Sequence, residues 1–333
     1  MAKIRYSLVA AVTAASLVLT ACGNGESSSS NETTAANGTT TITVEDNFGT
    51  EEIAQPIERV AITDNRSFEI LDDWGIVPVA VPKSLVPATV PDYKDNADIV
   101  DLGNHREPNL EALAAAQPDL VVNGQRFTQY REDIVKLVPE AAVVDFSPRD
   151  DKPLDEELKR QATELGVIFD KEAEADKLVA DFDAALERAK AAYDPTKKVM
   201  AVNVSGGTIG FIAPGIGRTY GPIFDLLNLT PALEVDDASQ NHQGDDISVE
   251  AIAAANPDWI LVLDRDGGTS SRNEPGYIAA TDVIEGSEPL KNVVAIQEGN
   301  VVYAPQDTYT NENIITYTEI LNDIADAFEA QNN

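Results

Sequence analysis

A thirteen-residue stretch occurs twice in this chain, with an offset of 139 positions. Residues 110–122 read LEALAAAQPDLVV and residues 249–261 read VEAIAAANPDWIL, and seven of the aligned positions are identical. Each copy is typical of a short helix that ends at a Pro-Asp pair and leads into a buried strand. Solenoid repeats are only ~20–50 residues long. Unless two alanine-rich helices match by chance, the duplication predicts two similar α/β lobes.

The similarity between the two copies extends in both directions. Upstream, Asn109 aligns with Ser248, and both residue types are good helix N-caps. Downstream, Arg126 aligns with Arg265, each just beyond an apolar run. In doubly wound α/β lobes, ligands bind outside the carboxyl ends of the strands. Two facing lobes are therefore expected to form a cleft to which both arginines contribute.

The charge balance of the chain restricts its partners. There are 57 acidic and 24 basic residues, which gives a formal net charge of −33. This excess of negative charge argues against binding to nucleic acid or to anionic lipid headgroups. It also makes any cluster of arginines conspicuous.

The first 21 residues resemble a bacterial lipoprotein signal peptide. Lys3 and Arg5 form a basic start, and the apolar run 8–19 is shorter than the roughly 20 residues of a membrane span. The run leads to Cys22, the sole cysteine, which matches the lipidated residue of a lipobox. An ordinary signal peptide followed by an unrelated cysteine is the alternative. A lipidated Cys22 predicts a protein anchored at the outer face of the cytoplasmic membrane, and a sole cysteine excludes intrachain disulfides.

The rest of the chain divides into four parts. Residues 22–40 are rich in Ser, Thr, Asn and Gly, which predicts a disordered tether. Residues 41–170 and 194–333 alternate strand and helix patterns, which predicts two Rossmann-like lobes with mostly parallel sheets. Between them, residues 171–193 have one apolar face and predict a rigid spine helix ~34 Å long. The helix before it is expected to stop at Gly166. A single rigid connection predicts limited closure of the lobes.

Several stretches of the second half resemble one protein family. They are Ser205–Gly207, Pro214–Gly221, Asn241–Ser248 and Asn256–Asp266, together with the lipobox and the duplicated module. This combination resembles the substrate-binding lipoproteins of ABC importers for iron–siderophores, haem and cobalamin. The resemblance implies the helical-backbone (class III) periplasmic binding protein fold and a monomer without an intrinsic cofactor. Its details favour a ferric siderophore of the catecholate type as ligand, and haem or cobalamin is the alternative.

An exported hydrolase is a further alternative, but no catalytic motif supports an enzyme. No serine lies in a G-x-S-x-G motif, and no H-E-x-x-H motif occurs. The glycine-rich stretch 205–217 lacks the spacing of a phosphate-binding loop. We therefore expect a binding protein and no enzyme.

The expected ligand suits arginine. Three catecholates around Fe(III) give a complex of charge −3 with outward-facing rings. A guanidinium stays charged, donates hydrogen bonds in a planar fork and stacks on π faces. Arg126 and Arg265 follow from the duplication, and the resemblance implies Arg218 as a third ligand-binding arginine. The alternative is that each arginine pairs with an acidic residue; Arg66 is a weaker candidate, and Tyr220 is expected either to pack or to line the cleft.

The resemblance also implies residues that contact iron and the permease. His242 and Tyr309 match positions that coordinate Fe(III) when a siderophore leaves sites open, and phenolate and imidazole are suitable donors. His105, the other histidine, is expected at the cleft rim. Glu111 and Glu250, one in each copy of the module, match the carboxylates that dock onto the membrane permease. Stabilisation of a helix dipole is the alternative role for these two glutamates.

Overall fold

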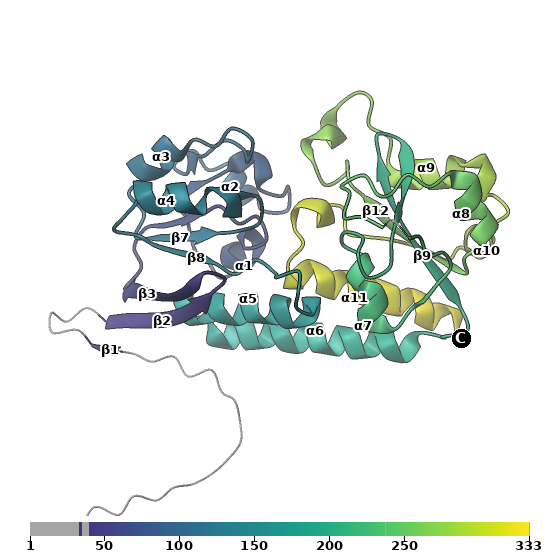
Figure 1. The fold of residues 1–333 in the computed structure, drawn as a ribbon, viewed down its shortest axis with the longest axis horizontal. Helices are drawn as coiled ribbons and strands as arrows, with labels where there is room; N and C mark the ends of the chain where they lie inside the picture. Colours follow the sequence, from purple (N-terminus) through teal and green to yellow (C-terminus); the bar gives the residue numbers. More distant parts are fainter. Residues whose placement is uncertain (1–32, 35–39, 237, 333) are drawn as a thin grey trace, which may run out of the picture.

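The chain forms two lobes joined by long helices, as seen in a computed structural model that describes residues 33–34, 40–236 and 238–332 (Figure 1). The predicted signal peptide, Cys22 and most of the predicted tether lie outside the described residues. Within the tether range, β1 (Thr33–Thr34) pairs with β2 (Thr40–Asp46) in an antiparallel manner. No helix in the described part of the chain has both the length and the apolar character of a membrane span.

The N-terminal lobe is built on a sheet with strand order β6–β5–β4–β7–β8, in which every neighbouring pair is parallel. Its strands are β4 (Val60–Ile62), β5 (Ala80–Val81), β6 (Val100–Asp101), β7 (Leu120–Asn123) and β8 (Ala142–Asp145). The connections contain α1 (Phe68–Asp73), η1 (Lys83–Leu85), α2 (Pro91–Lys94), α3 (Leu110–Ala115), η2 (Gln125–Tyr130) and α4 (Arg131–Leu137). A separate hairpin of β2 and β3 (Gly49–Gln55) precedes this sheet. Parallel pairing brings the carboxyl ends of all five strands to one edge.

The C-terminal lobe has a mixed sheet with order β10–β9–β12–β13, and β11 also pairs with β9. Its strands are β9 (Lys198–Ser205), β10 (Thr208–Ile212), β11 (Thr230–Pro231), β12 (Trp259–Asp264) and β13 (Val301–Tyr303). The connections contain α7 (Gly221–Leu227), α8 (Val249–Ala255), η3 (Ser270–Asn273), α9 (Ala280–Gly286), η4 (Glu288–Leu290), α10 (Val294–Glu298) and η5 (Thr308–Thr310). Only β10 is antiparallel to its neighbour. Gly206 and Gly207, both at positive φ (58° and 74°), form the tight turn that starts β10.

The duplicated module has the same structure in both lobes. The side chain of Asn109 accepts a hydrogen bond at the start of α3, and that of Ser248 does so at the start of α8, which confirms the two predicted N-caps. The carboxylates of Asp119 and Asp258 accept backbone N–H groups at the entry to β4 and β9, at 3.0 and 2.8 Å. The shared Pro-Asp pair therefore ends a helix and also ties the following strand to its neighbour.

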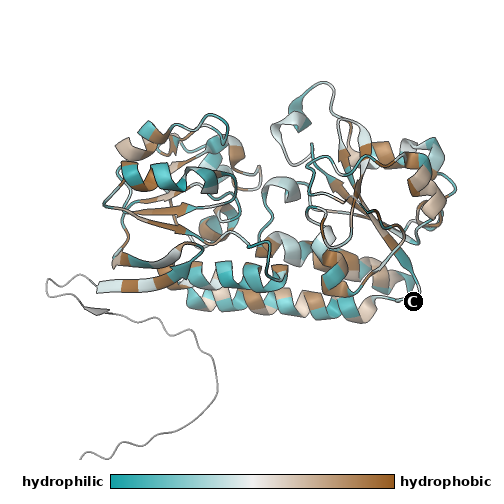
Figure 2. Ribbon diagram, in the orientation of Figure 1, coloured by the Kyte–Doolittle hydropathy of each residue, from teal (hydrophilic) through white to brown (hydrophobic). Residues whose placement is uncertain are grey.

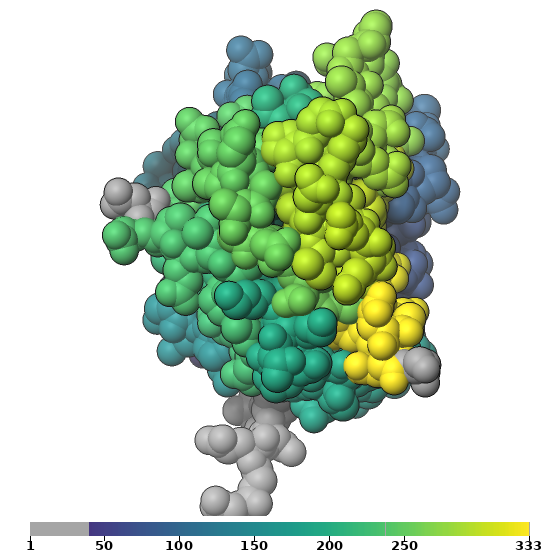
Figure 3. Space-filling view, turned by 90° about the vertical axis from the view of Figure 1, so that its right-hand side faces the viewer, coloured from purple at the N-terminus to yellow at the C-terminus, as the bar shows by residue number. Residues whose placement is uncertain are grey.

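Three long helices, α5 (Leu154–Phe169), α6 (Glu172–Ala192) and α11 (Ile314–Gln331), pack against one another beneath the lobes. Helix α6 confirms the predicted spine, and α11 packs along it. Figure 1 shows α6 running beneath both lobes, and the ends of α6 and α11 lie side by side at the lower edge of Figure 3. In Figure 2 the strands of both lobes are mostly apolar, whereas α5 and α6 alternate apolar and polar positions. One continuous cluster of buried apolar side chains includes residues of both sheets and of these helices. Shared burial of this kind makes the two lobes and the spine one packed body.

The prediction that a helix stops at Gly166 was wrong. Helix α5 (Leu154–Phe169) continues for three more residues and ends at Asp170, which adopts a left-handed conformation (φ 56°). A Cβ atom at Gly166 would lie 2.7 Å from the Cβ of Ala175 on α6. This glycine therefore permits the close approach of α5 and α6.

Candidate functional site

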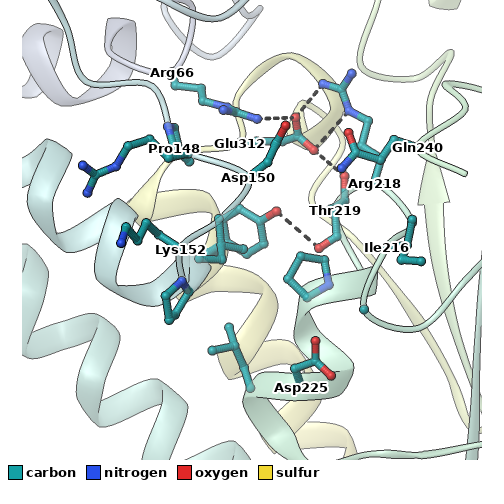
Figure 4. Close-up of a pocket in the computed structure, with 18 of the residues that line it drawn as sticks. Arg66, Pro148, Asp150, Lys152, Ile216, Arg218, Thr219, Asp225, Gln240 and Glu312 are labelled. Atoms are coloured by element: carbon teal, nitrogen blue, oxygen red, sulfur yellow. Dashed lines mark hydrogen bonds and ion pairs between the residues drawn. The ribbon is translucent and has the colours of Figure 1, made fainter. Parts of the chain in front are cut away.

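Two adjoining cavities of about 450 and 460 Å³ lie between the lobes. They share lining residues from both sides, among them Arg66 and Gln125 of the N-terminal lobe and Gln240 and His242 of the C-terminal lobe. Residues of the N-terminal lobe follow the carboxyl ends of β4, β7 and β8, where parallel α/β sheets bind ligands. Figure 4 shows the first cavity with residues of both lobes facing it. The location agrees with the cleft predicted from the duplication.

The ring of Tyr309 lies under three arginines, of which Arg126 and Arg218 line the two cavities. The guanidinium carbons of Arg218, Arg265 and Arg126 lie 4.4, 5.0 and 5.7 Å from the centroid of its ring. Nη2 of Arg126 also donates a hydrogen bond to the phenol oxygen at 3.2 Å. Tyr309 is only 4% exposed. The structure therefore brings together the three arginines predicted for ligand binding, and the tyrosine ring holds them as a group.

A buried carboxylate, that of Glu312, forms the other side of the group. Arg218 donates from Nε to Oε1 at 3.2 Å and from Nη2 to Oε2 at 2.5 Å, and Nη2 of Arg66 lies 3.4 Å from Oε2. Figure 4 shows Arg66 and Arg218 approaching Glu312 from opposite sides. The hydroxyl of Thr219 donates to Oε1 at 2.5 Å. Burial raises the pKa of Glu312, but Arg218 and Arg66 outweigh it and lower the pKa to about 2.

The arginines differ in how far acidic residues neutralise them. Arg265 donates to Asp266 at 2.7 Å, and Arg218 shares Glu312 with Arg66. Arg126, in contrast, forms no ion pair with a carboxylate among the residues that the structure describes. Its contacts are the phenol of Tyr309 and Nε2 of His105, at 3.2 and 3.3 Å. The predicted alternative, pairing with acids, thus applies to Arg218 and Arg265 but not to Arg126.

Both histidines lie beside the arginines and are kept neutral. Nδ1 of His242 lies 2.9 Å from Nη1 of Arg218, and it must accept because a guanidinium only donates. Burial and then Arg218, Arg126 and Arg265 lower the pKa of His242. Burial and Arg126 likewise lower the pKa of His105. A neutral imidazole is the form that can coordinate a metal ion.

The pKa of the Tyr309 phenol is shifted in the opposite direction from that of an ordinary buried tyrosine. Burial alone raises its pKa, but Arg218, Arg126 and Arg265 outweigh burial, so the net pKa is lowered. Its ring makes an edge contact with the ring of His242, with centroids 6.2 Å apart. Within the described residues, no group of three or more His, Cys, Asp or Glu side chains could hold a metal ion. An iron ion at this position would therefore need most of its donors from a bound ligand.

The remaining predicted residues lie apart from this group. Tyr220 is 0% exposed and packs in the core, so it does not line the cleft. The sequence places Tyr220 at the start of a helix but cannot indicate which face the ring occupies. Glu111 and Glu250 are exposed in the first turns of α3 and α8, on different lobes (Figure 1).

Comparison with known proteins agrees with the two-lobed fold. The sequence profile of the periplasmic binding proteins matches residues 60–308. The chain belongs to this family. It is 30% identical over 295 residues to the ferric-anguibactin-binding protein of Vibrio anguillarum, which covers 87% of this chain and 88% of that protein. It is 28% identical over 334 residues to the petrobactin-binding protein of Bacillus subtilis, covering 99% and 100% of the two chains.

Solved structures show the same arrangement of lobes. A siderophore-binding protein, bound to a complex of two acinetobactin molecules and ferric iron, matches with a TM-score of 0.74 and 25% identity, covering 86% of this chain and 98% of that one. A catecholate-siderophore-binding protein of Vibrio cholerae matches with a TM-score of 0.72 and 23% identity, covering 87% and 99%. These relatives are named as siderophore-binding proteins, and the chain is a binding protein and not an enzyme.

Proposed function

We propose that the protein binds an anionic ferric siderophore in the cleft between its lobes. The observation that carries this proposal is the convergence of Arg126, Arg218 and Arg265 on one tyrosine ring in a chain of net charge −33. Like charges repel at this separation, so the group is poised for an anion. Relatives named for ferric anguibactin and petrobactin support iron as the cargo.

Catecholates suit the cleft better than hydroxamates, haem or cobalamin. The oxygen atoms of a ferric catecholate carry negative charge that guanidinium groups can bind with charge-assisted hydrogen bonds. Its aromatic rings can stack on the planar face of an arginine. Arg126 is the arginine most available to bind such a ligand, because no carboxylate in the described structure competes for it.

His242 and Tyr309 are proposed to coordinate iron when the siderophore leaves positions open. The lowered pKa of His242 favours the neutral ring, and the lowered pKa of Tyr309 favours the phenolate. Fe(III) accepts both donors. Arg218 now holds Nδ1 of His242, and Arg126 holds the phenol oxygen, so a bound ligand would free both donors by attracting these arginines.

The protein is proposed to deliver its ligand to an ABC permease as a lipid-anchored monomer. A signal peptide over residues 1–21 and lipidation at Cys22 would place it outside the cytoplasmic membrane. Glu111 and Glu250 are proposed to dock onto the permease. Their exposure and their placement on separate lobes suit contact with two permease subunits.

Titration of the protein with four ligand classes tests this function. Intrinsic fluorescence would be measured during addition of a ferric catecholate, a ferric hydroxamate, haem or cobalamin. We expect the ferric catecholate to quench at micromolar concentration or below and to bind most tightly. If only haem or cobalamin quenches, the protein binds that ligand and the siderophore proposal is wrong. If none of the four quenches, the proposed function is overturned.

A further inference from the structure

We infer that the buried carboxylate of Glu312 tunes the charge selectivity of the cleft, because it reduces the advantage that a triply negative complex has over a less negative complex of the same shape. This inference rests on the proposed function and specifies its substrate class. The charge of a ferric complex depends on how many catecholates surround the metal. Three catecholates give −3, whereas two give −1.

The charges around Tyr309 balance only part of a ligand charge of −3. Two carboxylates, those of Glu312 and Asp266, face four arginines: Arg66, Arg126, Arg218 and Arg265. This leaves a net charge of +2. The outer lining of the cavities adds two cations, Arg149 and Lys152, and two carboxylates, Asp150 and Asp225. The net charge of the described lining therefore remains +2.

Glu312 is the carboxylate that a ligand cannot displace easily. Its side chain is 3% exposed, and it accepts hydrogen bonds from Arg218, Arg66 and Thr219. Asp266 is more accessible, with 17% of its side chain exposed, and it also accepts the backbone N–H of Gly206 at 2.6 Å. A fixed negative charge beside Arg218 and Arg66 lowers the attraction of these two cations for an anion. The penalty grows with each negative charge on the ligand.

Two complexes of the same shape and different charge provide the test. A hexadentate tripodal tris-catecholate forms a complex of charge −3 with Ga(III) and of charge −2 with Ti(IV). Because the ligand is the same, the steric fit to the cleft largely cancels in the ratio of the two dissociation constants. Isothermal titration calorimetry would measure this ratio for the wild-type protein and for variants. We expect Glu312 to keep the preference for the Ga(III) complex smaller in the wild-type protein than in a variant without this carboxylate.

Glu312→Gln keeps the shape of the side chain and removes the charge. We expect it to shift the ratio roughly tenfold toward the Ga(III) complex. Removing one negative charge from the cleft relieves more repulsion for the −3 complex than for the −2 complex. Arg66→Gln has the opposite effect on charge and should shift the ratio toward the Ti(IV) complex, so the inference stays testable if Glu312→Gln fails to fold. Glu285→Gln, on the exposed side of α9, is the matched control and should leave the ratio unchanged.

The outcomes separate this inference from the proposed function. If Glu312→Gln binds both complexes with the same ratio of dissociation constants as the wild-type protein, the role of Glu312 is overturned and the proposed function stands. A shift of the ratio toward the Ti(IV) complex in Glu312→Gln would also overturn this role. If no catecholate complex binds the wild-type protein at all, the proposed function fails and the inference fails with it.

Discussion

Replacing Arg126 by alanine should weaken ligand binding without unfolding the protein. Among the described residues, the guanidinium of Arg126 forms hydrogen bonds only with the phenol of Tyr309 and the ring of His105, at 3.2 and 3.3 Å. Its removal leaves no buried carboxylate behind, so the free energy of unfolding should fall by less than ~1 kcal/mol. A lost charge-assisted hydrogen bond to an anionic ligand costs about 1.5–3 kcal/mol. The dissociation constant should therefore rise by about 10- to 150-fold.

Arg218→Ala is the informative partner of this variant. Glu312 would then stay buried with only the more distant Arg66 as a cation, and breaking a buried pair costs about 3 kcal/mol or more. In Arg218→Ala, both the ligand affinity and the free energy of unfolding should therefore fall. In Arg126→Ala, the affinity should fall while the free energy of unfolding stays nearly unchanged. Calorimetric titration with a ferric catecholate and urea unfolding measure the two quantities. Undiminished affinity in Arg126→Ala would refute the reasoning, because that arginine has no carboxylate partner in the described structure to occupy it.

Three further predictions concern pH, uptake and iron. Because the folded pKa of Glu312 is depressed to about 2, its contribution of about 3 kcal/mol should be present above pH ~4.5 and be lost as the pH falls toward 2. The difference in unfolding free energy between wild-type protein and Glu312→Gln should therefore shrink between pH 7 and pH 3; a constant difference would contradict this. Glu111→Ala combined with Glu250→Ala should leave ligand affinity intact and impair cellular iron uptake, and loss of binding would argue against docking. With a tetradentate ferric catecholate, Tyr309→Phe and His242→Ala should each shift the charge-transfer band, whereas a hexadentate complex should show no shift.

Much of the site could be predicted because the duplication relates its parts. Arg126 and Arg265 occupy equivalent positions after β7 and β12, and the structure brings both within 6 Å of one tyrosine ring. Arg218 has no counterpart in the repeat and was identified only through resemblance to a family. Tyr309 was expected as an iron ligand, and its position beneath three arginines was not foreseen.

The features that were missed depend on contacts between distant residues. Glu312 pairs with Arg218, 94 positions earlier, and no local pattern marks a glutamate in an Asn-Glu-Asn sequence as buried. Gly166 has the pattern of a helix stop, but its role depends on Ala175 of the next helix. Local propensity could not reveal either role, because tertiary packing decides both.

The contacts between the lobes predict that ligand binding closes the cleft only slightly. The amides of Asn311 and Asn313 donate to Glu69 on α1 at 2.8 and 3.0 Å, and the hydroxyl of Thr89 donates to Asp307 at 2.6 Å. These bonds cross from one lobe to the other on the side of the cleft near α11, while α6 fixes both lobes beneath. Closure by a large hinge motion would break them and expose the shared apolar cluster.

Small-angle X-ray scattering with and without a ferric catecholate would measure the closure. We expect the radius of gyration to change by less than about 1 Å, as in pre-organised binding proteins. Glu69→Ala removes the acceptor of two of the interlobe hydrogen bonds and should increase the change. A larger change in the wild-type protein would show that the apolar cluster and α6 do not hold the lobes at a fixed angle. In that case the ligand would change the spacing of the charged groups, and the charge arrangement seen without ligand would not determine selectivity.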